Sequence, residues 1–385
     1  MKILHVIPSV QKAAGPSVFC LEVCDMLKGM GHEVTVAVID PDRQDTYPSR
    51  NAVPLVSFSS VWSGNSYSHP YDVAHIHGMW LLPLHRMTRW VISQGIPIIW
   101  SPHGMLSPWA LRYKRWKKSI PWLLYQKHDL KKVSCFHVTT PTEAGHVRRC
   151  GLSQPVAIAP LGVEMPPDIS QLQKNGKIVL FLSRVHPSKG IANLFQAWAK
   201  MKDSPLMKGW RIVVAGPDAL GHQSELLGLA KTLGLQAGDC SSCADSERQQ
   251  AVRDSAQDVI FTGTVYGELK DALHRMADLF VLPTYSDNFG VVVPDALSYG
   301  LPVITTKGAP WEELETERCG KWIDIGVDPL AEALKEMMGI SDEERQLMGK
   351  RGRDLVGRKF TWDSIGIKMS HAYETLLAGK KTEER

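Results

Sequence analysis

The chain alternates short apolar stretches with stretches of helical spacing, and this alternation constrains its fold more than any other feature. Residues 2–7 are apolar and β-branched, residues 8–16 form a loop that contains Gly15, and residues 17–30 have the spacing of a helix, which Gly31 ends. Strands that alternate with helices in this way predict parallel sheets with right-handed crossovers. The further strands that the pattern predicts lie at residues 33–39, 73–76, 97–100, 135–139, 178–182, 211–215, 259–261, 279–282 and 302–305.

A single interruption divides the pattern. From residue 160 to residue 177, Pro, Gly and polar residues predominate, which is typical of a linker. We therefore predict an α/β fold with two facing Rossmann-like domains, residues 1–165 and 177–361, and a C-terminal helix within residues 362–385 that packs back on the first domain. Ligands of such sheets bind beyond the carboxyl ends of the strands, so a site is expected in the cleft between the two halves.

Charge and cysteine content exclude several classes of function. The net charge of +4 is too small to indicate nucleic-acid binding. Residues 101–150, however, hold ten Lys or Arg and only two acids, Asp129 and Glu143, which favours an anionic partner. Seven cysteines do not indicate a disulfide framework, and Cys20 and Cys24 have the helical spacing of a packed face. Because the apolar start is too short for a signal peptide and no stretch approaches the roughly 20 residues that span a bilayer, we expect a cytoplasmic protein.

The segment 284–305 carries the most specific chemistry. A polar loop with Gly290 leads into a helix with Pro294 in its first turn, and backbone amides at such a start attract anions. Asp287 in the loop and Asp295 in the helix frame this point, and one carboxylate can accept both hydrogen bonds of a vicinal diol such as a ribose. One acid is then expected to hold the ribose while the other faces the sugar. From these residues alone, it is equally open that Asp287 only caps the helix and Asp295 only supports its dipole.

Two cations after the predicted strand 178–182 suit a diphosphate. Arg184 offers a bidentate fork and Lys189 offers a point charge, both at the carboxyl end of a strand. Together they would stabilise the negative charge on a departing nucleoside diphosphate. Taken alone, such a pair is more often solvated surface.

Together these segments resemble the family-4 (group 1) retaining glycosyltransferases, which have two Rossmann-like domains in the GT-B architecture. The resemblance covers essentially the whole chain and is strongest to members that build bacterial exopolysaccharides and lipopolysaccharides, through HIHGMW, PHGMLSPWAL and GAPWEEL. Asp287 and Asp295 fall where the family has two glutamates separated by seven residues, and Arg184 and Lys189 fall on its diphosphate-binding cations. Since Asp is one methylene shorter than Glu, an inactive or specificity-shifted member is an alternative.

The resemblance implies roles for further residues. His103 would face the transferred sugar from the first domain, and Gly15 would approach the donor phosphate or the acceptor. Asp287 would meet the donor sugar and Asp295 would hold the ribose. The other donor-binding residues that it implies are Gly263 and Val265 at the base, and Asn288, Phe289, Gly290 and Val291 at the sugar. It implies no metal and no cofactor.

The function implied is transfer of a hexosyl unit from a nucleotide diphosphate sugar to a hydroxyl of a lipid-linked glycan, with retention of configuration. Two alternatives remain open: a catalytically silent subunit that binds nucleotide or lipid in a polysaccharide assembly complex, and a nucleotide-sugar 2-epimerase. Residues 109–132 mix Trp with basic residues, which suits peripheral membrane contact or a lipid-linked acceptor. The alternative there is an ordinary amphipathic helix with its Trp side chains in the core, and Pro121 is expected to break any single long helix.

Weaker signals concern histidine and cysteine. His75 and His77 are two apart on a predicted strand, and only one of them, His77 near the strand end, is expected to face the site. Cys240 and Cys243 lack the second pair that a four-ligand zinc site needs. They fall in a polar stretch, residues 237–257, that has the composition of a surface insertion.

Overall fold

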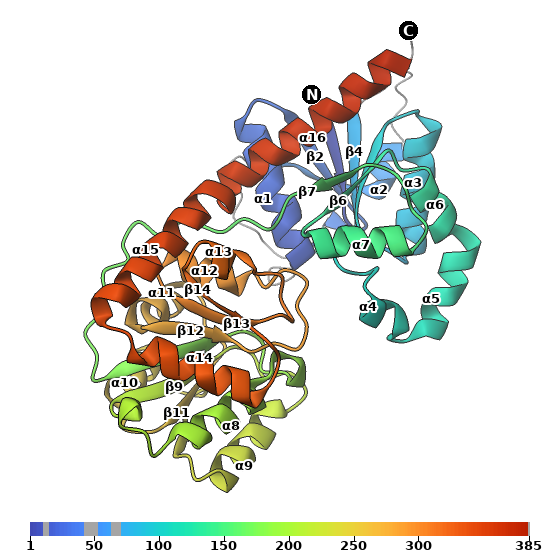
Figure 1. Cartoon of the computed structure of the whole chain (residues 1–385). Helices are drawn as coiled ribbons and strands as arrows, with labels where there is room; N and C mark the ends of the chain where they lie inside the picture. Colours follow the sequence, from blue (N-terminus) through green and yellow to red (C-terminus); the bar gives the residue numbers. More distant parts are fainter. Residues whose placement is uncertain (11–14, 42–52, 63–70, 384–385) are drawn as a thin grey trace. The chain divides into compact units, whose positions relative to one another are not determined.

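The structure is a computed structural model in which residues 1–10, 15–41, 53–62 and 71–383 are described. The chain forms two compact units: Met1–Gly162 with Trp362–Arg385, and Val163–Thr361. Each unit contains a seven-stranded parallel sheet flanked by helices (Figure 1). The predicted α/β class with two parallel sheets is confirmed.

The first sheet reverses its direction of growth between its two central strands. Its order is β3-β2-β1-β4-β5-β6-β7, and every pair is parallel. The chain therefore builds outward from β1 on one side, returns to β4, and builds outward on the other side. Such a reversal is the point where open α/β sheets bind ligands. The strands are β1 (Lys2–Val6), β2 (Glu33–Val38), β3 (Leu55–Ser57), β4 (Val73–His77), β5 (Ile98–Ser101), β6 (Cys135–Val138) and β7 (Val156–Ile158).

The C-terminal helix α16 (Trp362–Glu383) belongs to the first unit and packs against α1 (Gly15–Gly29). The two helices approach closely at Gly366, where an added Cβ would lie 2.7 Å from the Cβ of Met26. Ile365 and Tyr373 of α16 are buried in the same hydrophobic cluster as the inner face of α1. The other helices of this unit are α2 (Phe58–Trp62), α3 (Leu82–Ser93), α4 (Pro108–Arg112), α5 (Arg115–Pro121), the π-helix η2 (Trp122–Gln126), α6 (Lys127–Lys131) and α7 (Pro141–Arg149).

The second sheet repeats this plan, with the order β10-β11-β9-β8-β12-β13-β14 and parallel pairing throughout. Its reversal falls between β8 and β12, which are neighbours at the centre of the sheet. The strands are β8 (Lys177–Leu182), β9 (Trp210–Ala215), β10 (Ala237–Asp239), β11 (Val259–Gly263), β12 (Leu279–Leu282), β13 (Val303–Thr306) and β14 (Gly320–Ile323).

The helices of the second unit include two pairs that pack together, α8 with α14 and α12 with α15. Their bounds are α8 (Ile191–Met201), α9 (His222–Thr232), α10 (Asp245–Asp254), α11 (Gly267–Met276), α12 (Val292–Ser298), α13 (Glu313–Thr316), α14 (Val327–Gly339) and α15 (Asp342–Lys359), with short 3₁₀ turns η3 (Pro187–Lys189) and η4 (Pro205–Met207).

The segment before β8 is not a free linker. The chain passes between the units at Gly162–Val163, and residues 163–176 then run along the second unit. Asp168 forms an ion pair with Arg275 at 2.9 Å, and the backbone N–H of Leu172 donates to the Arg275 carbonyl at 3.1 Å. Because these polar groups are paired locally, the Pro-rich composition marks an irregular segment that packs on the second unit.

Two other local predictions are wrong. The stretch 237–257 is not a surface insertion, because it contains the edge strand β10 and the crossover helix α10. Pro121 does not break the helical segment: α5 continues into η2 and α6 without interruption. A π turn, η2, directly follows the proline and joins α5 to α6.

No described helix is both long and apolar enough to cross a membrane.

Candidate functional site

The loops that follow β8 and β12 are bound to each other at the reversal of the second sheet. The carbonyl of Ser188 accepts from the backbone N–H of Tyr285 at 2.8 Å and from the hydroxyl of Thr284 at 3.0 Å. Gly190 has φ +69°, and a Cβ there would lie 2.0 Å from the carbonyl oxygen of Pro283. Only glycine allows this approach, so residues far apart in sequence are held together at the carboxyl ends of the two central strands.

This contact brings Lys189 to Asp287. The ammonium of Lys189 forms an ion pair with Asp287 Oδ2, and both side chains are largely buried. The other oxygen, Oδ1, accepts from the backbone N–H of Gly290 at 3.1 Å, and the N–H of Asp287 donates to the Gly308 carbonyl at 2.7 Å. Asp287 therefore both caps the loop and pairs with a cation, and its contact with the donor sugar stays a prediction.

Asp295 lies on α12 and faces α11. Its Oδ2 lies 2.6 Å from the ammonium of Lys270 and 3.8 Å from His274 Nε2. His274 is buried and stacks on Tyr299 at 4.4 Å between ring centroids. Burial lowers the pKa of His274, partly offset by the charge of Asp295. The sequence does not indicate Lys270 as the partner of Asp295, because its helix has the composition of an ordinary charged surface.

The remaining predicted donor residues divide between core and surface. The ring of Phe289 is buried and packs on the ring of Trp311, with 5.1 Å between the ring centroids. Its side chain therefore points into the core, and only its backbone remains for contact with a donor. Val265 is likewise buried. Asn288 is half-buried, and Val291 and Arg184 are exposed. Gly290 and Gly263 have positive φ angles of +75° and +68°. Among the described residues, none forms an ion pair or hydrogen bond with the Arg184 guanidinium.

In the first unit, His103 follows β5 in a strained loop. Its φ is +50°, in the left-handed region that residues other than glycine rarely adopt. The loop is held by Glu143 of α7, whose Oε1 accepts from the N–H of Gly104 at 2.5 Å and whose Oε2 accepts from the N–H and hydroxyl of Thr139 at 2.8 Å. In the sequence, Glu143 was counted only as one of two acids in a basic region; its supporting role depends on the tertiary fold.

His103, which is half-buried, is one end of a histidine cluster, which we define as His5, His75, His77, His103 and His137; the other four are buried. His77 Nδ1 lies 3.0 Å from His103 Nε2, and His77 Nε2 lies 3.0 Å from His5 Nδ1. The expectation that only one of His75 and His77 faces the site is wrong. Residues two apart on a strand share a face, and the two rings stack at 4.2 Å between centroids.

Hydroxyl groups complete the cluster. His75 hydrogen-bonds with the Tyr373 hydroxyl at 2.7 Å and with Ser101 Oγ at 2.6 Å, and the same Ser101 Oγ lies 2.6 Å from His137 Nδ1. Burial lowers the pKa of each of His75 and His103 well below its usual range. The pKa of His137 is lowered by burial to about 3. These imidazoles are therefore neutral at physiological pH.

The structure gives fewer contacts for Gly15 and for the cysteines that the sequence analysis considered. Gly15 is the first residue of α1, and the loop before it, residues 11–14, lies outside the described residues. Cys240 donates to the Phe261 carbonyl at 3.2 Å, and Cys20 and Cys24 are buried as expected of a packed face.

Comparison with solved structures supports the fold over nearly the full length. Sucrose-phosphate synthase from Thermosynechococcus elongatus has a TM-score of 0.73 at 18% identity, covering 98% of this chain and 100% of that chain. The Anabaena protein HepE, solved in complex with UDP, has a TM-score of 0.74 at 15% identity, covering 97% of this chain and 100% of that chain. The fold therefore defines a protein of the two-domain GT-B class.

Sequence comparison then specifies the family. The profile described as Glycosyltransferase Family 4 matches residues 13–165, and that described as Glycosyl transferases group 1 matches residues 166–355. The chain belongs to the family-4 (group 1) glycosyltransferases. A D-inositol 3-phosphate glycosyltransferase of Salinispora tropica is 29% identical over 217 residues, a match that spans 55% of this chain and only 41% of the relative.

Proposed function

We propose that this chain transfers a hexosyl unit from a nucleotide diphosphate sugar to a hydroxyl of a glycan, with retention of configuration, in surface or exopolysaccharide biosynthesis. The observation that carries the proposal is the pairing of Lys189 with Asp287 at the reversal of the second sheet, close in sequence to the exposed Arg184. Family membership and the UDP bound to HepE, whose fold this chain shares, support the donor class.

The charges of this group suit a leaving diphosphate. Arg184 and Lys189 carry two positive charges and Asp287 one negative charge, which leaves a net positive charge at the carboxyl ends of the strands. An ammonium has three N–H donors, so Lys189 can keep its bond to Asp287 while it donates to a phosphate oxygen. We propose that this stabilisation replaces a bound metal, and that Asp287 orients Lys189 as well as meeting the donor sugar.

Asp295 is proposed to hold the ribose. Lys270 occupies one of its oxygens at 2.6 Å, and a carboxylate has roughly four lone-pair sites, so acceptor capacity remains for two hydroxyl groups. Lys270 also orients the shorter Asp side chain, which we infer offsets part of the reach lost relative to Glu. In the first unit, His103 is proposed to support the reacting sugar as a neutral imidazole.

Nucleotide binding tests the donor site. Thermal unfolding of the purified protein is measured with UDP, GDP, ADP and their common sugar conjugates, because a ligand of the folded state raises the midpoint by mass action. One nucleoside diphosphate should raise the midpoint, and the rise should disappear in Lys189→Ala and in Arg184→Ala. Lys200→Ala is the matched control, since Lys200 also pairs with an aspartate, Asp328, but on the exposed surface of the same unit. No shift with any nucleotide would refute the site.

Product analysis separates the three functions. Transfer requires an acceptor and yields a nucleoside diphosphate with a glycosylated product. A 2-epimerase would convert the nucleotide sugar without any acceptor. A silent subunit would bind nucleotide and yield neither product, an outcome that the two aspartates keep open.

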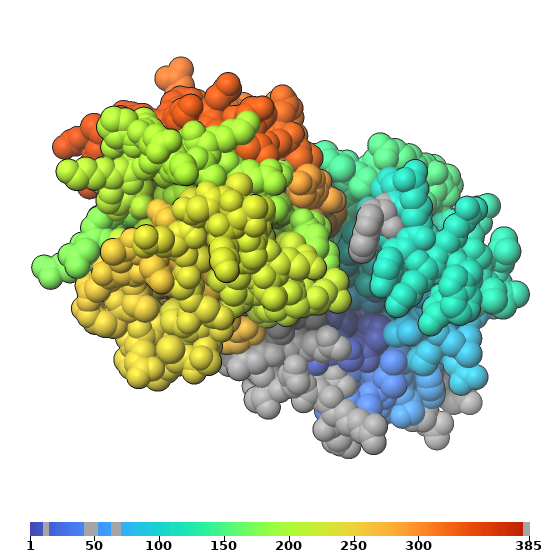
Figure 2. Space-filling view, turned by 90° about the horizontal axis from the view of Figure 1, so that it is seen from below, coloured from blue at the N-terminus to red at the C-terminus, as the bar shows by residue number. Residues whose placement is uncertain are grey.

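Peripheral membrane contact is the proposed route to a lipid-linked acceptor. The segment that contains α5 and η2 lies at the surface of the first unit (Figure 2). It exposes Trp116, Leu123 and Leu124 by 69%, 81% and 75%, and cations such as Lys117 are exposed in the same segment. Trp116 is therefore not a core residue. Exposed apolar groups among cations fit the interface of an anionic bilayer, where each Lys or Arg contributes about 1 kcal/mol.

Vesicle sedimentation tests this contact. The protein should sediment with vesicles that contain phosphatidylglycerol, less so at high salt, and little with purely zwitterionic vesicles. The double variant Leu123→Ser, Leu124→Ser should lose binding, whereas Leu347→Ser, at an exposed leucine of the second unit, should retain it. Equal sedimentation of both variants would refute the proposed surface.

A further inference from the structure

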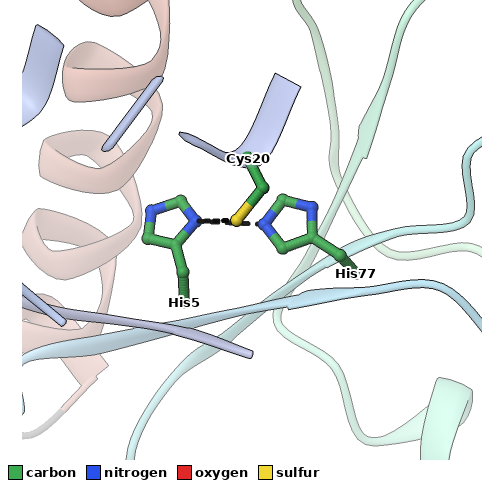
Figure 3. A group of neighbouring side chains, drawn as sticks. All are labelled: His5, Cys20 and His77. Carbon is green, nitrogen blue, oxygen red and sulfur yellow. Dashed lines mark hydrogen bonds between the residues drawn. The ribbon is translucent and has the colours of Figure 1, made fainter. Parts of the chain in front are cut away.

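Three potential metal ligands converge at the reversal of the first sheet (Figure 3). His5 lies on β1 and His77 on the adjacent β4, and Cys20 projects from α1, which packs over these strands. His5 Nδ1 lies 3.0 Å from His77 Nε2 and 3.8 Å from Cys20 Sγ, and the three atoms all lie within 4.8 Å of one another. All three side chains are fully buried.

The separations fit a tetrahedral zinc site. With Zn–N bonds of about 2.05 Å and Zn–S bonds of about 2.3 Å, two ligand nitrogens lie about 3.3 Å apart and a nitrogen and a sulfur about 3.6 Å apart. The His5–His77 and His5–Cys20 separations, 3.0 Å and 3.8 Å, differ from these values by a few tenths of an ångström. The third separation, from Cys20 to His77, is within 4.8 Å, so the side chains would rotate to enclose an ion.

The outer nitrogens of the two histidines already have partners. His5 Nε2 lies 3.4 Å from the Tyr373 hydroxyl, and His77 Nδ1 lies 3.0 Å from His103 Nε2. Metal-bound histidines nearly always donate their second N–H to such a group, which selects the tautomer that leaves the other nitrogen free to bind. The two nitrogens that face each other here are the ones without these outer partners.

The charge of the site points to a fourth ligand. Zn²⁺ with two neutral imidazoles and one thiolate keeps a positive charge, which is costly in a fully buried position. Cys24 lies one turn further along α1 and is buried, but it is not among the three groups whose ligand atoms lie within 4.8 Å of one another, so its side chain would have to turn toward the ion. A second thiolate would make the site neutral.

We propose that His5 Nδ1, His77 Nε2 and the Cys20 thiolate bind one Zn²⁺, with Cys24 as the fourth ligand. The thiol protons leave to solvent on binding. The ion fixes the proton of His77 on Nδ1, which then donates to His103 Nε2 and places the proton of His103 on Nδ1. The site is structural and lies in the first unit, whereas the proposed diphosphate-binding residues belong to the second. Its one link to the proposed transfer chemistry is the tautomer of His103.

Metal content and cobalt substitution test the proposal on the full chain without a histidine tag. Protein purified in reducing buffer is analysed for bound metals, stripped with a chelator, and titrated with Zn²⁺ and with Co²⁺. We expect one ion per chain, and a cobalt spectrum with thiolate charge-transfer absorption and the visible bands of tetrahedral coordination. Cys20→Ser should weaken Zn²⁺ binding by at least about 100-fold and remove the charge-transfer absorption or reduce it to that of one thiolate.

Matched variants locate the ion. Cys135→Ser, at a buried cysteine on β6 of the same unit, should leave binding unchanged. Cys24→Ser should halve the charge-transfer absorption and keep the ion, since the three converging ligands His5, His77 and Cys20 all remain. The wild-type titration needs no variant, so a folding failure of Cys20→Ser leaves the test intact. Absence of stoichiometric binding, or binding that Cys20→Ser does not affect, overturns the proposal, and nucleotide shifts measured in parallel remain a separate test.

Discussion

His137 should make the first unit lose stability in mild acid. The ring is buried, stacks on Phe19 at 4.5 Å, and lies between Ser101 Oγ at 2.6 Å and the Ala159 carbonyl at 2.8 Å. The carbonyl can only accept, so the proton lies on Nε2, and Nδ1 accepts from the Ser101 hydroxyl. A second proton on Nδ1 would place two donors face to face with no anion nearby. Burial accordingly lowers the pKa of His137 to about 3.

The sign and size of the effect follow from linkage. A histidine of the unfolded chain has a pKa of about 6.5, so above that pH neither state binds the proton and stability is complete. Between about 6.5 and 3 only the unfolded state binds it, and stability falls as pH falls. Between pH 7 and pH 5 one such group removes about 2 kcal/mol from the free energy of unfolding.

Denaturant unfolding at the two pH values, with a chelator present, measures this contribution. His137→Gln keeps a neutral donor and acceptor but cannot titrate, so its loss of stability from pH 7 to pH 5 should be smaller than that of the wild type by about 2 kcal/mol. His128→Gln, at an exposed histidine of α6, should retain the wild-type loss. Equal pH dependence of wild type and His137→Gln would refute the assignment of a neutral, buried His137.

Three further substitutions test individual contacts. Gly190→Ala should destabilise the second unit by about 3 kcal/mol, because φ is +69° and the new Cβ would meet the Pro283 carbonyl; an unchanged thermal midpoint would contradict the close approach of the two loops. Tyr373→Phe should cost about 1–3 kcal/mol by leaving His75 Nδ1 without its donor at 2.7 Å, measured by denaturant unfolding; a neutral result would show that water replaces the hydroxyl. Glu143→Ala should speed amide exchange at Gly104, whose N–H it binds at 2.5 Å, and unchanged exchange would show that the loop is held by other contacts.

The central strands could be predicted because they are buried on both faces. β12 has the predicted bounds, and β8, β9 and β13 differ from prediction by a residue at one or both ends. The four strands that the pattern missed are β3, β7, β10 and β14, which are the edge strands of the two sheets. They have only three or four residues and are mostly half-buried or exposed, so they need no continuous apolar run.

For the site residues as well, the sequence indicated some features and not others. The sequence indicated Lys189 and Asp287 separately, because loops after parallel strands meet at one edge of the sheet. It did not indicate their mutual ion pair, nor that Asp295 would pair with Lys270, since those contacts depend on which side chains the packing of two neighbouring loops or helices directs toward each other. These contacts remain structural facts, and the roles of the residues in donor binding remain predictions.

By itself, the sequence determined the periodic pattern of strands and helices, and from it the parallel α/β class and the edge of each sheet where chemistry is expected. Only the tertiary structure decided which buried polar groups meet. The contacts among His5, His77, His103 and Tyr373 join β1, β4, the loop after β5 and α16. Periodicity records which face of one element is buried, whereas contacts between elements depend on strand order and on helix packing, which no local pattern encodes.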